Sequence, residues 1–384
     1  AKVDGSKGIK IMGTDIKPIV KKIDDNVQGL KSFHESLAQN ASEKEQDILL
    51  QFPTVYIHNW KNTGDYEVYI GESNNIIQRT KQHYDAGIDE SKWQHQLFLQ
   101  DASLYIIGHE HFNKSMTLDI ENRLMLYMMS VDRVRKIHNL RGNPQSRYYP
   151  DSEMDDIFQM IWKKLRKDNK ELFPSESAIK DSAVFKASPL HKLTEEQEAV
   201  KLKIIQRVFG ALQTGKRGQL IFVEGEAGTG KTVLNSSTFY EIFASSEEQE
   251  MEPLKCCMMV NHDEQITVYE QIARKLGLVE RYGEVVYKPT SFINRHSVDE
   301  PIDVAFIDAN HTYASTREYF NVLAGRVHEK SVIVVDDIHH SEEMEEAWKA
   351  ICADDRVTTT MDLYQMGLVF FDEHYWKRNY RMIL

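Results

Sequence analysis

The spacing of hydrophobic residues in the first half of the chain changes several times between helical periodicity and strand-like alternation. From Ile19 to Leu50 the sequence is polar, with weak helical periodicity. "TVYIHNW" and "YEVYIGES" alternate around a short polar turn, which predicts an antiparallel hairpin followed by a helix beginning near Asn75. "ASLYIIGHEH" predicts a third strand, and "LDIENRLMLYMMSV" has the spacing of a half-buried helix. The proline- and serine-rich "FPSESAIKDSAVFKASPLHK" predicts a linker.

Beyond this linker the pattern becomes a regular alternation of helices and short apolar strands. "LTEEQEAVKLKIIQRVFGAL" and "KTVLNSSTFYEIF" predict helices, whereas "GQLIFVEG", "CCMMV", "DVAFID" and "SVIVVDD" predict strands. Such alternation favours a doubly wound, mostly parallel sheet. We therefore expect an α/β protein, in which a small α+β domain is followed by a mostly parallel α/β sheet domain. The predicted parts are a helical extension (1–50), a first domain (51–150), a helix and linker (151–190), a second domain (191–304) and a tail (305–384).

Composition and charge narrow the classes of function. The chain has 384 residues, 3 cysteines and a net charge of −12, which predicts a cytoplasmic protein without a disulfide framework or membrane segment. This charge argues against a general nucleic-acid coating protein. Two basic windows, Arg133–Arg147 and Lys163–Lys170, are either solvated faces or phosphate contacts.

Residues suited to phosphodiester chemistry occur around the predicted hairpin. Tyr56 and Tyr69 fall near the ends of its strands, and Glu121 falls on a later helix. Arg79 and His83 are four residues apart on the helix between them, so they share a face. A carboxylate can hold a hard divalent cation, an arginine can neutralise charge on phosphorus, and a tyrosine or histidine can assist the attacking water. Structural roles for each residue taken alone remain open.

In order and spacing this set resembles the GIY-YIG endonuclease family. "TVY" (Thr54–Tyr56) stands at the first triplet of the family and "YIG" (Tyr69–Gly71) at the second. The first triplet departs from Gly-Ile-Tyr at two of three places, although its tyrosine is kept. The resemblance implies a metal-dependent endonuclease in which Tyr56 helps to activate water and Glu121 binds Mg²⁺ or Mn²⁺. It also assigns catalytic roles to Tyr69, Arg79, His83 and Asn143, with Asn139 as the alternative for the last.

A second chemistry is predicted by "FVEGEAGTGKTVL", which fits the phosphate-loop pattern between a predicted strand and a helix. Gly225, Gly228 and Gly230 would let backbone N–H groups turn towards the phosphates of ATP. Lys231 would reach the β- and γ-phosphates, and the Thr232 hydroxyl would bind Mg²⁺. The alternative is a chance match in a glycine-rich turn.

The neighbouring sequence resembles helicases. "LTEEQ" is similar to the adenine-reading motif of superfamily 1 helicases, which assigns Gln197 to the base. From there to about Val304 the chain resembles the Schlafen-group-3-type DNA/RNA helicase domain. In that family the strand that corresponds to "DVAFID" ends in Asp-Glu-Ala-His. This chain has Asp308-Ala309-Asn310-His311 at the same place. Asp308 would still contact Mg²⁺ of the bound nucleotide, but the residue that polarises water is replaced, so we expect slow hydrolysis.

The tail from about Ala305 resembles the last third of a class I S-adenosylmethionine-dependent methyltransferase, without that fold's glycine-rich cofactor motif. A second helicase core would then have to come from a partner chain. Taken together, the sequence predicts an endonuclease coupled to an ATP-binding module, with nucleic acid as partner, DNA before RNA. The alternatives are a nucleotide-gated binding module without catalysis and an S-adenosylmethionine-dependent methyltransferase.

Overall fold

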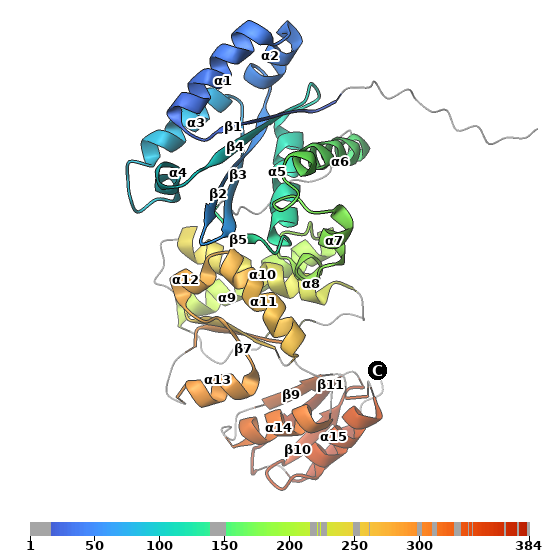
Figure 1. The fold of residues 1–384 in the computed structure, drawn as a ribbon. Helices are drawn as coiled ribbons and strands as arrows, with labels where there is room; N and C mark the ends of the chain where they lie inside the picture. Colours follow the sequence, from blue (N-terminus) through green and yellow to red (C-terminus); the bar gives the residue numbers. More distant parts are fainter. Residues whose placement is uncertain are drawn as a thin grey trace, which may run out of the picture. The chain divides into compact units, whose positions relative to one another are not determined.

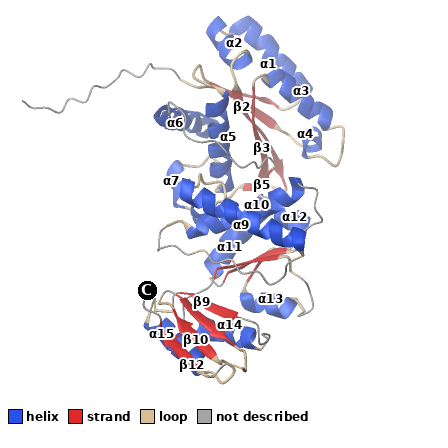
Figure 2. Ribbon diagram, turned by 180° about the vertical axis from the view of Figure 1, so that it is seen from behind, coloured by secondary structure: helices blue, strands red, loops and turns tan. Residues whose placement is uncertain are grey.

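The computed structural model of the chain contains two compact units, and each is treated by itself (Figures 1 and 2). The first comprises residues 1–254 and 268–285, and the second residues 255–267 and 286–384. Both combine helices with sheets, which confirms the predicted α/β class. The described residues are 17–138, 151–215, 221, 223, 229–248, 254–260, 262–297, 302–308, 313–325, 332–336, 338–339, 341–364, 366–374 and 376–381.

A five-stranded sheet organises the N-terminal part of the first unit. The predicted hairpin is confirmed: β2 and β3 pair antiparallel from Thr54 with Ser73 to Asn62 with Asp65. Thr63 and Gly64 connect them with φ of 53° and 95°, the positive values that a tight two-residue hairpin turn requires. The strand order is β1 (Ile19–Asp24), β4 (Ser103–Gly108), β2 (Thr54–Asn62), β3 (Asp65–Ser73) and β5 (Val134–Ile137).

Two expectations for this unit need correction. The predicted helical extension contains a strand as well as helices, because β1 pairs with β4 along its whole length and so belongs to the sheet. The predicted linker is folded: it forms α7 (Glu176–Asp181) and α8 (Ala183–Ala187), and buries Phe173 completely. The indole of Trp162 donates to the Pro174 carbonyl at 2.9 Å, which holds this segment against the preceding helix.

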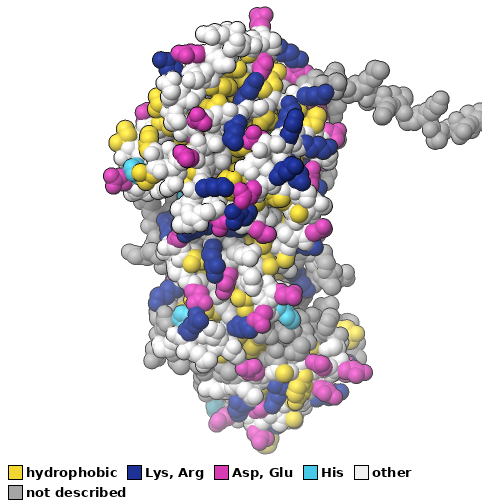
Figure 3. All heavy atoms as spheres, viewed as in Figure 1, with side chains coloured by type: hydrophobic (Ala, Val, Ile, Leu, Met, Phe, Trp, Pro, Cys, Tyr) yellow, Lys and Arg dark blue, Asp and Glu magenta, His cyan; other side chains and the backbone are white. Residues whose placement is uncertain are grey.

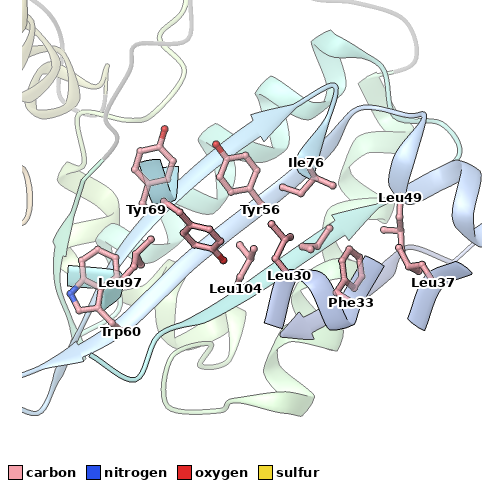
Figure 4. Close-up of a cluster of buried hydrophobic side chains, with 12 residues drawn as sticks. Leu30, Phe33, Leu37, Leu49, Tyr56, Trp60, Tyr69, Ile76, Leu97 and Leu104 are labelled. Atoms are coloured by element: carbon pink, nitrogen blue, oxygen red, sulfur yellow. The ribbon is translucent and has the colours of Figure 1, made fainter. Parts of the chain in front are cut away.

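Helices cover both faces of the five-stranded sheet, with α1 to α3 on one side and α5 and α6 on the other (Figures 1 and 2). On the first side, Leu30, Phe33 and Leu37 of α1 form one buried cluster with Tyr56, Tyr69 and other sheet residues (Figure 4). These helices are α1 (Val27–Asn40), α2 (Glu43–Leu50), α3 (Ile76–Ala86), η1 (Trp93–His95), α4 (Gln96–Leu99), α5 (Lys114–Met129) and α6 (Asp151–Asp168). The segments that follow the folded linker form α9 (Glu195–Thr214), α10 (Lys231–Glu248), α11 (Asp263–Lys275) and α12 (Leu278–Tyr282).

The second unit contains two sheets. The first is parallel, as expected, with the order β7 (Val286–Tyr287), β6 (Cys256–Val260) and β8 (Val304–Asp308). The expectation that "SVIVVDD" extends it is wrong, because β9 (Val332–Asp336) pairs antiparallel with β11 (Met366–Phe370) in a four-stranded sheet. The other strands and helices are β10 (Thr359–Asp362), β12 (Arg378–Arg381), α13 (Pro289–Arg295), α14 (Tyr313–Ala324) and α15 (Glu342–Ala353).

Among the described residues, every helix is too short or too polar to cross a membrane.

Candidate nuclease site and phosphate loop

The hydroxyl group of Tyr56 is the centre of the cluster predicted around the hairpin. Arg79 donates from Nε to this oxygen at 3.3 Å, and His83 Nε2 lies 3.0 Å from it. A guanidinium can only donate, so the tyrosine oxygen accepts from Arg79 and its own proton points to His83. His83 therefore accepts at Nε2 and carries its proton at Nδ1. Since α3 places Arg79 and His83 one turn apart, both reach the same strand residue.

Burial keeps both partners of this hydrogen bond neutral. Tyr56 is 1% exposed, and desolvation raises the pKa of its phenol far above the ordinary range. Burial, followed by the charges of His58 and Arg79, lowers the pKa of His83 to about 2. In this arrangement Tyr56 is a phenol that can pass on a proton rather than a phenolate base.

Tyr69 completes the aromatic part of the cluster. Its ring stacks on Trp93 with centroids 4.2 Å apart, and lies 6.2 Å from the ring of Tyr56. The hydroxyl groups of Tyr56 and Tyr69 point in the same direction (Figure 4). Gly71 faces Tyr56 across the hairpin, and a Cβ there would lie only 2.5 Å from the tyrosine oxygen. The glycine of "YIG" is therefore required by the position of Tyr56.

Glu121 comes from a different part of the unit. It is 5% exposed on α5, a helix that packs against β2 and β3. Neighbouring strand residues point to opposite faces, and Glu72, next to Gly71, forms an ion pair with Lys114 at the start of α5. Helix α5 thus begins on the face away from Tyr56. The structure brings Tyr56, Tyr69, Arg79 and His83 together, and places Glu121 across the hairpin from them.

The residues predicted to hold a divalent cation can be tested against the chemistry of Mg²⁺. Mg²⁺ keeps several water ligands and often binds one or two carboxylates. One buried carboxylate such as that of Glu121 fits this requirement. Within the described residues, no group of three or more His, Cys, Asp or Glu side chains is arranged to hold a metal. Asn143 and Asn139 lie outside the described residues.

A second buried polar network beside the cluster was missed by the sequence analysis. The Nδ1 atom of His58 lies 2.5 Å from one carboxylate oxygen of Asp25, and the Tyr84 hydroxyl donates to the other at 3.0 Å. All three residues are buried. One signal could have found His58, because it follows Tyr56 by two residues on a strand and so shares its face. Asp25 had no such signal, since it belongs to a segment without recognisable chemistry.

An open cavity of about 630 Å³ adjoins the aromatic cluster at Trp93. Its lining includes Glu67, whose carboxylate accepts from Asn62 at 2.8 Å and lies 2.7 Å from His138 Nε2. The basic residues at its rim are partnered, with Lys136 paired with Glu280 and Arg135 donating to Thr63. Arg133 in the same basic window pairs with Asp65 and Glu171. On the face shown in Figure 3, basic and acidic side chains are interspersed.

The described part of the phosphate loop has the expected start of a helix. Gly230 has a φ of 84°, and α10 begins at Lys231, followed by Thr232. Backbone N–H groups at such a helix start favour an anion, so these residues fit the phosphates of ATP. Gln197 contacts this loop: its Nε2 donates to the Thr229 carbonyl at 2.8 Å, and its Oε1 accepts from the Thr194 backbone in the capping box of α9. Adenine reading by Gln197 stays a prediction, and it would require this amide to exchange a protein contact for the base.

The remaining predicted nucleotide-binding residues have only partial descriptions. Gly225 and Gly228 lie outside the described residues, as does most of the strand predicted before the loop. Asp308 is the last residue of β8 in the second unit, and its side chain is also outside the described part.

Comparisons with known proteins support the helicase-like part of the prediction. Residues 218–375 match the family model described as Schlafen group 3, DNA/RNA helicase domain. The match continues past Val304, so it gives no support to a change to a methyltransferase-like family there. An uncharacterized protein of Saccharomyces cerevisiae is 26% identical over 151 residues, which are 37% of this chain and 33% of that protein. The alignment therefore spans about a third of the length of this relative. No solved structure matches the chain.

The family match indicates that residues 218–375 form a helicase-like part with a nucleotide-binding function related to nucleic acids. The matched residues begin after the hairpin, α3 and α5. The family match therefore does not cover the cluster around Tyr56, and the role of that cluster is argued from its geometry.

Proposed function

We propose that the chain is a metal-dependent endonuclease that nicks DNA and carries an ATP-binding, helicase-like part. The observation that supports the nuclease most strongly is the hydrogen-bonded series from Arg79 through Tyr56 to His83. A guanidinium, a phenol and a neutral imidazole are joined through one oxygen atom. This set can neutralise charge on a phosphate and accept a proton from an attacking water.

Each residue has a distinct part in this proposal. Arg79 is only partly buried, so its guanidinium can contact a phosphate oxygen while Nε holds Tyr56. Tyr56 receives a proton from the water as its own proton passes to His83. A divalent cation held by Glu121 would stabilise the negative charge that develops on the phosphate.

The helicase-like part is proposed to bind ATP through Lys231 and the N-terminus of α10. The family match and the helix start at Lys231 support this assignment. Ala309 replaces the glutamate expected to polarise water, so we expect binding with slow turnover. Coupling between ATP binding and DNA cleavage remains part of the proposal.

A plasmid-nicking assay with matched glutamate variants tests the nuclease. Supercoiled DNA is incubated with Mg²⁺ or Mn²⁺ and the wild-type chain, Glu121→Gln or Glu67→Gln. Both glutamates are buried in the same unit, but Glu67 is held by Asn62 and His138. We expect Glu121→Gln to reduce nicking by at least ~100-fold and Glu67→Gln to retain it.

Two results would contradict this assignment. Equal nicking by the wild type and Glu121→Gln would remove Glu121 from the site. DNA binding by the wild type, without nicking in either metal, would favour the alternative of a binding module without catalysis.

A further inference from the structure

The buried pair formed by Asp25 and His58 lies directly beside the proposed nuclease cluster. His58 is 0% exposed and Asp25 is 2% exposed. The His58 ring contacts the rings of Tyr56 and His83 edge to face, with centroids 5.3 Å and 5.0 Å away. The imidazole that pairs with this carboxylate is thus in ring contact with the two residues that handle the proton in the proposed reaction.

One atom of this pair has an unused hydrogen-bonding capacity. Because an ionised carboxylate only accepts, the 2.5 Å contact places a proton on His58 Nδ1. The other ring nitrogen, Nε2, is buried and has no hydrogen-bond partner within the described residues. In a neutral imidazole this Nε2 is a proton acceptor. Buried polar atoms without partners are rare in folded proteins, so this one calls for a functional explanation.

The proposed reaction requires such an acceptor. When Tyr56 passes its proton to His83, a buried imidazolium forms near the guanidinium of Arg79, and two neighbouring positive charges oppose each other. The low pKa of His83 reflects the same burial and the same neighbours. Asp25 is the carboxylate that the described contacts connect to this cluster, and it can offset the positive charge.

We propose that the His58–Asp25 pair takes up the proton that Tyr56 and His83 pass on from the attacking water. This inference rests on the proposed nuclease function. The water oxygen bonds to phosphorus, and the leaving oxygen departs with the electron pair of the broken P–O bond. The water proton moves to Tyr56 and the Tyr56 proton to His83 Nε2. The Nδ1 proton of His83 then moves to His58 Nε2; no hydrogen bond joins these two rings in the structure, so this last transfer requires a small ring movement or one bridging water. Asp25 stabilises the resulting imidazolium, which later returns its proton to solvent, and the leaving oxygen is protonated by solvent.

The groups that face His58 come from several elements. They are Tyr56 on its own strand, Asp25 after β1, Tyr69 on β3, His83 on α3, and Trp93 on η1, while Tyr84 on α3 contacts Asp25. Asp25 is the acidic member of this set at neutral pH. Its removal therefore takes away the negative charge that would stabilise a proton on His58.

The test compares Asp25→Asn with Tyr84→Phe in the full chain by single-turnover nicking of plasmid DNA with Mg²⁺ across pH. Both changes remove an interaction of the same carboxylate, but Tyr84→Phe leaves the contact with His58. We expect Asp25→Asn to reduce the maximal rate by at least ~100-fold and to move the acidic limb of the pH–rate profile to lower pH. Tyr84→Phe should retain the rate within about threefold, with an unmoved limb.

The outcomes separate this inference from the proposed function. Nicking by the wild type, together with an unmoved limb in Asp25→Asn, overturns the role of the pair alone. Absence of nicking in the wild type overturns the proposed function and the pair with it. A measurement on the wild type also covers the case in which Asp25→Asn fails to fold: the ¹⁵N NMR signal of His58 Nε2 should be that of an unprotonated nitrogen at neutral pH. A protonated Nε2 from pH 6 to 9 would overturn the inference, because the pair would have no acceptor to offer.

Discussion

Lys275 should make the stability of the protein depend on pH in a defined direction. This lysine is 7% exposed, and its Nζ donates at 2.8 Å to both the Met129 and Val131 carbonyls at the end of α5. Burial lowers its pKa from 10.5 to about 8, although Asp132 and Asp65 act in the opposite direction. Helix α5 also carries Glu121, so Lys275 joins α11 to the helix of the proposed metal ligand.

The sign follows from proton binding in the two states. Below about pH 8 the lysine is charged in both states, and the folded state bears the full cost of burying that charge. As pH rises past about 8, the folded state releases the proton while the unfolded state keeps it up to 10.5. The contribution of Lys275 to stability therefore rises over this interval. Between about pH 7.5 and about pH 9.5 this difference contributes about 2 kcal/mol. Burial raises the pKa values of the Cys256, Cys257 and Cys352 thiols, and these groups act in the opposite direction over the same interval.

The assay is urea unfolding of the wild type, Lys275→Met and the control Lys180→Met, whose lysine is exposed. Relative to Lys275→Met, the wild type and Lys180→Met should both gain about 2 kcal/mol of stability between these two pH values, because the cysteine contributions are common to all three proteins and cancel. Higher pH is avoided because burial raises the pKa values of Tyr56, Tyr84 and Tyr105. Above the pKa of a free tyrosine these side chains ionise more readily in the unfolded state, which lowers the free energy of unfolding. Parallel pH dependence of the wild type and Lys275→Met would refute the reasoning.

Two further predictions concern the phosphate loop and the hairpin. Lys231→Ala should weaken ATP binding by at least ~10-fold in calorimetry, because it removes the side chain that reaches the terminal phosphates. Fast DNA-stimulated ATP turnover by the wild type would contradict the expected slow hydrolysis. Gly71→Ala should destabilise the fold by about 1–3 kcal/mol and reduce nicking, because its methyl group would lie 2.5 Å from the Tyr56 oxygen. The control Gly210→Ala has open space around the added carbon and should raise the melting temperature.

Local signals in the sequence account for the parts of the site that were predicted correctly. Strand alternation and the short turn define the β2–β3 hairpin, and a spacing of four residues places Arg79 and His83 on one face of α3. Both signals lie within a few residues of the structure that they predict. The position of Tyr56 between Arg79 and His83 follows from these two elements.

Long-range pairing accounts for what was missed. Asp25 reaches His58 only because β1 pairs with β4, about eighty residues away in the sequence, and no local pattern encodes that contact. The strand β9 was identified correctly as a strand, but its antiparallel partner β11 comes later in the chain. A short apolar run in the sequence indicates a buried strand, but it does not indicate which sheet that strand joins.

The most direct test of the central claim compares two buried tyrosines of the same unit. Tyr56 contacts Arg79 and His83, whereas Tyr84 contacts Asp25. Both phenylalanine substitutions remove one buried hydroxyl, so nonspecific effects on stability are matched. In Mg²⁺-dependent nicking of supercoiled plasmid, Tyr56→Phe should lose at least ~100-fold in rate while Tyr84→Phe stays near the wild type. Equal rates for Tyr56→Phe and the wild type would contradict the proposal that the Arg79–Tyr56–His83 series cleaves nucleic acid.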